Sequence, residues 1–104
     1  MLGKLKLQIN LLYSAPLKVK DTKALLDGEV VLSFKDLEIS EYPPHLGKIS
    51  MKVAQGRHKL EVLDSNFDLK KTQAFTIKKQ MWIDIIIHDD SISVHLLDKE
   101  PRYK

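Results

Sequence analysis

Asp84 and His95 are the two side chains whose types and expected placement come closest to catalytic chemistry. The alternation of polar and apolar residues on either side of Asp89-Asp90 predicts a hairpin that puts Asp84 directly opposite His95. A carboxylate can orient an imidazole so that the ring acts as a general base. No serine, cysteine or second carboxylate is placed to complete such a site, so we interpret the pair as a cross-strand ion pair worth roughly 0.2–1 kcal/mol. We therefore expect no catalytic residues and no enzyme activity.

The other histidines could be metal ligands, but their surroundings in the sequence favour structural roles. His58 is predicted to face inward, half-buried or buried, with its ring bonded to a backbone carbonyl. His88 precedes the Asp89-Asp90 turn, which offers two carboxylates where calcium takes about six or more oxygen ligands. His45 has no apparent partner. The chain contains no cysteine, which removes disulfides and thiolate zinc sites. We expect no metal and no cofactor.

An apolar trio, Trp82, Ile86 and Leu97, is predicted to point away from the core side of the same hairpin. The expected register pairs Trp82 with Leu97 and leaves Ile86 nearby. Apolar side chains on the outer face of a sheet are typical of contact surfaces, and tryptophan is enriched at their energetic centres. The alternative is that another segment covers the trio, either the charged tail or the loop at Tyr42-Pro43-Pro44. We predict these three as partner-binding residues.

The elements that position these side chains are all expected to be strands. Apolar residues alternate with polar ones from Lys4 to Tyr13, which predicts a strand. Asp27-Gly28 lies between two apolar runs, which is a strong hairpin signal. Ala54-Gln55-Gly56 is interpreted as a second hairpin turn. That hairpin would pair Val53 with His58, Met51 with Leu60, and Ile49 with Val62. Val30, Leu32 and Phe34 are expected to share one face. About seven short strands predict an all-β, antiparallel β-sandwich.

Two segments of the chain resemble a known family. Residues 23–31, KALLDGEVV, resemble the strand–turn–strand of PEGA-type domains, and residues 54–62, AQGRHKLEV, resemble their Pro-Gly-x-His-x-Val-x-Val segment. The resemblance covers about residues 22–88. Gln55 stands where the family has proline before Gly56. The resemblance implies an immunoglobulin-like or prealbumin-like (carboxypeptidase-regulatory-like) β-sandwich used for surface attachment or protein contact, without catalysis.

Length and charge bound the remaining possibilities. The chain has 104 residues, with 17 basic and 14 acidic side chains and a net charge of +3. This predicts a single domain over 1–97 and a charged C-terminal tail over 98–104. No run approaches the ~18 apolar residues of a membrane span, and no signal peptide is evident. As written, the chain is expected in the cytoplasm, or at the surface or in the periplasm if it is a fragment of a larger exported protein.

The leading functional hypothesis is a non-catalytic module that contacts a protein partner or itself through the apolar trio. The alternative is a carbohydrate or small-ligand module, in which Trp82 stacks on a sugar ring or Lys4 and Lys6 attract acidic partners. Nucleic-acid binding is not expected, because no aromatic residues lie among the outward lysines. Lys4 and Lys6 could also protect an edge strand from pairing with another chain.

Overall fold

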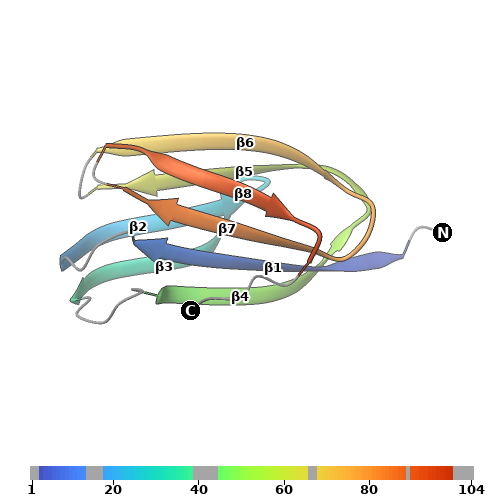
Figure 1. The fold of residues 1–104 in the computed structure, drawn as a ribbon, viewed down its shortest axis with the longest axis horizontal. Helices are drawn as coiled ribbons and strands as arrows, with labels where there is room; N and C mark the ends of the chain where they lie inside the picture. The colour runs from blue at the N-terminus through green and yellow to red at the C-terminus, as the bar shows by residue number, and fades with distance from the viewer. Residues whose placement is uncertain (1–2, 14–17, 39–44, 66–67, 89, 100–104) are drawn as a thin grey trace.

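The computed structural model describes residues 3–13, 18–38, 45–65, 68–88 and 90–99, and these residues form eight β-strands (Figure 1). The strands are β1 (Lys4–Tyr13), β2 (Lys18–Leu26), β3 (Glu29–Glu38), β4 (His45–Ala54), β5 (Gly56–Asp64), β6 (Leu69–Ile77), β7 (Met81–Ile87) and β8 (Ile92–Leu97). The described part of the chain contains no helix long and apolar enough to cross a membrane.

The strands form two four-stranded sheets that face each other (Figure 1). Sheet A has the order β4-β1-β7-β8, and sheet B has the order β3-β2-β5-β6. At the borders of the two layers, β3 contacts β4 and β6 contacts β8. The predicted all-β, sandwich-like architecture is confirmed. The expectation of purely antiparallel pairing is wrong, because β1 and β7 run parallel in the middle of sheet A.

The core lies between the two sheets. In β7 the side chains of Ile83, Ile85 and Ile87 are buried, so the predicted parity of this strand is confirmed. The inner faces of the other central strands contribute further buried apolar side chains: Leu7, Ile9, Leu11, Ala24, Leu26, Leu60 and Val62. Each strand thus turns alternate residues inward, as a half-buried sheet requires.

The Asp27-Gly28 hairpin joins β2 to β3 as predicted, with Leu26 opposite Glu29 and Leu25 opposite Val30. Beyond this point the pairing shifts by one residue between Ala24 and Leu25. A bulge of this kind turns the following side chains to the other face. Val30 is therefore exposed, whereas Leu32 packs against the core. The expectation that Val30 and Leu32 share a face is wrong.

The predicted hairpin at Ala54-Gln55-Gly56 does not form. β4 pairs with β1 in sheet A, and β5 pairs with β2 and β6 in sheet B, so this turn carries the chain from one sheet to the other. Val53 and Leu60 both face inward all the same, because the inner faces of both sheets border one core. The inward direction of these two side chains is therefore compatible both with a hairpin and with a crossing between sheets.

The suggestion that Lys4 and Lys6 lie at a sheet edge holds for the start of β1 only, because the rest of the strand runs between β4 and β7. The pairing with β7 begins only at Leu7, opposite Met81, so the two lysines precede it. The edge strand of this half of sheet A is β4.

Candidate functional site

The outer face of sheet A carries the predicted contact residues in rows that cross four strands. The register places Gln8 of β1 beside Trp82 of β7, and Trp82 directly opposite Leu97 of β8. Ser50 of β4 lies opposite Gln8 at the other end of the row. The predicted Trp82–Leu97 pair is thus confirmed as a register pair. Neither residue belongs to the buried core cluster.

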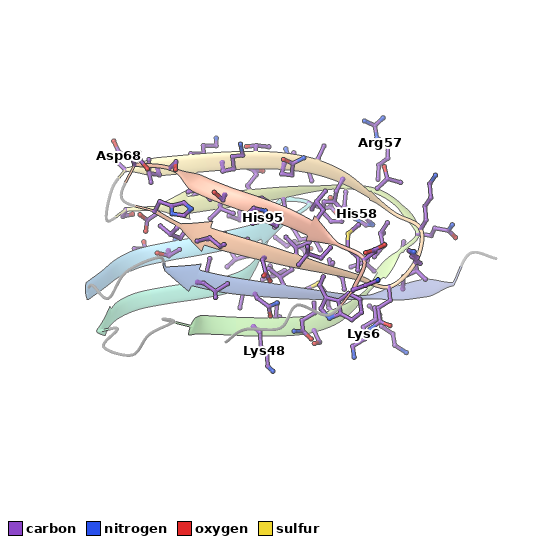
Figure 2. All side chains as sticks on the ribbon, viewed as in Figure 1. Lys6, Lys48, Arg57, His58, Asp68 and His95 are labelled. Atoms are coloured by element: carbon purple, nitrogen blue, oxygen red, sulfur yellow. The ribbon has the colours of Figure 1, made fainter. Side chains whose placement is uncertain are left out.

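The next row is polar, and it crosses Lys48, Asn10, Asp84 and His95. Figure 2 shows Lys48 and His95 toward the two ends of this row. The predicted register of Asp84 with His95 is confirmed. Asp84 also has a hydrogen-bond partner on its other side, in β1. The Asn10 side-chain amide donates to the Asp84 carboxylate at 2.9 Å. The two residues are 74 positions apart in the sequence but lie on neighbouring strands. The sequence carried no signal for this pairing.

A chain of hydrogen bonds links the polar row to its neighbour. The Ser50 hydroxyl donates to the side-chain carbonyl oxygen of Gln8 (Oε1) at 3.3 Å. The side-chain amide of Gln8 (Nε2) in turn donates to the side-chain carbonyl oxygen of Asn10 (Oδ1) at 3.0 Å. Asn10 and Asp84 are only 4% and 7% exposed, although both point away from the core. Buried polar groups that are bonded in this way hold a sheet face in a fixed arrangement. The side chains around Trp82 therefore form a preorganised surface.

Ile86 is not adjacent to Trp82. It lies four residues further along β7, roughly 13 Å away at the rise of a strand, with the Asp84 row between them. Its register partner is Leu12 of β1, which is only 6% exposed. The outer face therefore carries two apolar pairs, Trp82 with Leu97 and Ile86 with Leu12, on either side of the polar row. Leu12 was not among the apolar residues predicted for this face. Its even number could have indicated it, because the even-numbered side chains of β1 point outward.

Trp82, Ile86 and Leu97 are each half-buried. All eight described strands belong to the two sheets, so no described strand lies over this face. The segments proposed to cover the trio, at Tyr42-Pro43-Pro44 and in the tail, fall largely outside the described residues. The most exposed large apolar side chains among those described lie elsewhere: Val30, Leu63 and Leu96.

His58 forms the second polar cluster, and the prediction of a half-buried histidine bonded to a backbone carbonyl is confirmed. Its Nε2 lies 2.7 Å from the Ala54 carbonyl oxygen, and its Nδ1 lies 2.6 Å from a carboxylate oxygen of Asp27. The other carboxylate oxygen of Asp27 accepts the Lys59 backbone N–H at 2.9 Å. The His58 ring stacks on Phe75, with centroids 5.7 Å apart.

Both ring nitrogens of His58 thus face oxygen atoms that can only accept hydrogen bonds. The doubly protonated imidazolium is the form that donates to both. Accordingly, the hydrogen bonds that the ring donates to the Asp27 carboxylate and to the Ala54 carbonyl raise the pKa of His58 above its ordinary 6.5. The same hydrogen bond lowers the pKa of the Asp27 carboxyl below 3.8. This cluster ties the β2–β3 turn to the start of β5.

No group of three or more histidine or acidic side chains is placed to hold a metal ion within the described ranges. At the β7–β8 turn, the His88 Nε2 lies 3.1 Å from the Ser93 hydroxyl, and the His88 backbone N–H donates to the Ser91 carbonyl. Asp89 and the His45 side chain lie outside the described residues.

Comparison with known proteins places the chain in no family. No family model and no curated protein matches it. Solved structures do match, among them the crystal structure of a candidate cell adhesion protein from Bacteroides ovatus, with 11% sequence identity and a TM-score of 0.46. The match covers 97% of this chain and 47% of that protein, so the chain spans about half its length.

Proposed function

We propose that this chain is a non-catalytic β-sandwich module that contacts a protein through the outer face of sheet A, with Trp82, Leu97 and Ile86 as its apolar contact residues. The observation that carries the proposal is the direct pairing of Trp82 with Leu97 on a face that no described strand covers. Tryptophan is enriched among the residues that dominate the binding energy of interfaces, and the buried centre of an interface is more apolar than its rim.

The hydrogen bonds that link the Trp82 row to the polar row support the same function. Ser50, Gln8 and Asn10 are hydrogen-bonded in series toward Asp84, so the surface around Trp82 is already ordered before any partner arrives. A preordered surface loses less conformational entropy on binding. We also propose an immunoglobulin-like or prealbumin-like sandwich of the PEGA type, which the resemblance of residues 22–88 supports.

The test places a photo-crosslinking residue on this face. Leu97→p-benzoylphenylalanine is compared with Leu63→p-benzoylphenylalanine, which puts the same group on an exposed apolar position of sheet B. We expect irradiation in extracts of the producing cell to give a discrete crosslinked species from position 97, either with another polypeptide or with a second copy. That species should be absent from position 63 and lost when Trp82→Ser is added.

A second measurement can contradict the proposal without a partner. Trp82 is the single tryptophan of the chain, so acrylamide quenching of its fluorescence reports the accessibility of this face alone. A monomeric protein in which acrylamide does not quench Trp82 would mean that the chain covers its own tryptophan, and the contact face would not exist. Crosslinks that form equally from positions 97 and 63 would also rule it out.

A further inference from the structure

Four lysines lie on the outer face of sheet A, beside the Trp82 row. Lys6 of β1 is directly opposite Lys52 of β4, Lys4 is one step further along β1, and Lys48 lies opposite Asn10. All four side chains are exposed. Figure 2 shows Lys6 and Lys48 projecting from the β1–β4 half of the sheet. We call this set the lysine cluster.

The lysine cluster is not neutralised within the described part of the protein. On the outer face of sheet B, in contrast, Lys59 pairs with Glu61 at 3.4 Å and Lys23 with Asp21 at 4.0 Å. Asp84 is the one carboxylate that the described strands place on the outer face of sheet A, and it is 7% exposed and bonded by Asn10. The two faces therefore differ in charge, and that of sheet A is positive.

Protection of sheet edges explains the lysine cluster only in part. Lys48 and Lys52 lie on the edge strand β4, where lysine discourages pairing with another chain. Lys4 and Lys6 precede the pairing of β1 with β7, so they also lie on an open strand edge. Edge protection does not, however, require Lys6 to lie directly opposite Lys52. Directly opposed like charges destabilise a sheet, so the arrangement of Lys6 against Lys52 costs stability that an oppositely charged ligand would restore.

We infer that the partner of this face is an acidic polypeptide segment, which lies across Lys6 and Lys52 with its apolar side chains against Trp82 and Leu97. This inference rests on the proposed function and names its partner chemistry. Complementary charge steers such a segment to the face and excludes basic competitors. The Trp82 row directly adjoins the Lys6–Lys52 pair, so the apolar and charged contacts are within reach of one extended chain.

The charges also decide against the two other occupants. Packing this face on a second copy would bring the lysine cluster against lysines, with no exposed carboxylate on the described part of the face to meet them. A single-stranded nucleic acid would need aromatic side chains for its bases to stack on. Among the described residues this face presents one tryptophan, Trp82, which is half-buried, and one exposed ring, His95, but no tyrosine or phenylalanine.

The experiment titrates the full chain with a short poly-L-glutamate peptide and follows the fluorescence of Trp82. We expect binding at an ionic strength of ~0.01 M, where charges interact over ~30 Å, and its loss near ~1 M, where screening limits them to ~3 Å. The double variant Lys6→Glu/Lys52→Glu should bind about tenfold more weakly or not at all. The matched control, Arg57→Glu/Lys70→Glu, reverses two exposed charges on the outer face of sheet B and should bind as the wild type does.

Each other outcome overturns the inference. Equal loss in both double variants would show general attraction to a basic protein, and no binding at low salt would show that the lysine cluster attracts no acidic chain. Tighter binding of an oligothymidylate, abolished by Lys6→Glu/Lys52→Glu, would assign the face to nucleic acid.

Urea unfolding must show that both double variants are folded. The variant Lys6→Gln/Lys52→Gln, which changes the charge by less, should give an intermediate loss of binding. If acrylamide quenches Trp82 and the crosslink at position 97 forms, but poly-L-glutamate does not bind, the proposed contact face is supported and only the acidic nature of its partner is contradicted.

Discussion

The hydrogen-bonded pair of His58 and Asp27 makes stability depend on pH in a predictable direction. The pKa of His58 is raised, so its stabilising contribution is fully present below pH 6.5 and is lost as the pH rises through the raised pKa. The pKa of Asp27 is lowered, so its contribution is present above pH 3.8 and is lost as the pH falls through the lowered pKa. Both contributions are therefore present between pH 3.8 and 6.5, and the pair weakens as the pH rises through the raised pKa of His58.

We predict that Asp27→Asn lowers the free energy of unfolding by up to about 1 kcal/mol near pH ~5.5, and by less near pH ~9. The Asp27 side chain is 49% exposed, which keeps the expected effect at the level of a surface ion pair. Asparagine is chosen because it tolerates the positive φ of 51° at this position. Urea unfolding of both proteins at the two pH values measures the difference.

Asp68→Asn is the matched control for this prediction. Asp68 is exposed and has nearly the same backbone conformation, with φ of 54°, and no ion pair to a histidine is found for it among the described residues. Its substitution should leave stability and the pH dependence unchanged. If Asp27→Asn has the same effect at both pH values, His58 does not carry the charge that its two acceptors imply.

At the scale of elements, glycines mark the two points where the backbone conformation is most demanding. Gly56 starts β5, where the chain passes from sheet A to sheet B, with φ of 128°. Gly28, in the β2–β3 turn, has φ of 87°. An added Cβ would meet no atom within 4 Å at either site, so any cost of a side chain arises from the backbone itself.

We predict that Gly56→Ala lowers the free energy of unfolding by about 1–3 kcal/mol, because φ near 128° lies outside the narrow left-handed region open to other residues. Gly28→Ala should cost about 1 kcal/mol. Gly3→Ala, equally free of neighbouring atoms but with no such φ, should stay within about 0.5 kcal/mol. Chemical denaturation of the three variants ranks them, and an equal cost at all three positions would contradict the explanation.

The hairpins show what the sequence could and could not predict at this scale. The β7–β8 register follows from local alternation around a short turn, and Trp82 opposite Leu97 was predictable for that reason. The turn at Gly56 looks the same locally, yet it joins strands of different sheets. Alternation identifies the inward side chains, such as Val53 and Leu60, but does not say whether two successive strands share a sheet.

The contacts that give the candidate site its order are those that sequence reasoning could not reach. Asn10 and Asp84 meet because β1 and β7 pair in parallel, and no short turn links two such distant strands. The same pairing brings Leu12 beside Ile86. Outward parity identified the side chains of the proposed contact face, whereas their neighbours depended on the order of the strands.

At the scale of the whole molecule, the strand order places Trp82 and Ile86 on an interior strand of sheet A and Leu97 on the edge strand β8. β1 and β7 are the interior strands of sheet A, and β2 and β5 those of sheet B. Interior strands have both sides hydrogen-bonded, so their amides open to solvent only in larger unfolding events. Trp82 and Asn10 belong to interior strands, which makes them a rigid platform.

We therefore predict that native-state hydrogen exchange protects the amides of β1, β7, β2 and β5 most strongly, and those of the edge strands β3, β4, β6 and β8 less. NMR-detected exchange resolves this residue by residue, and the protected amides of β7 should exchange with a free energy close to that of global unfolding. Exchange near Trp82 as fast as on the edge strand β8 would mean that this part of sheet A opens locally. The contact face would then have to become ordered on binding, and the low entropic cost that favours it as a preformed surface would be lost.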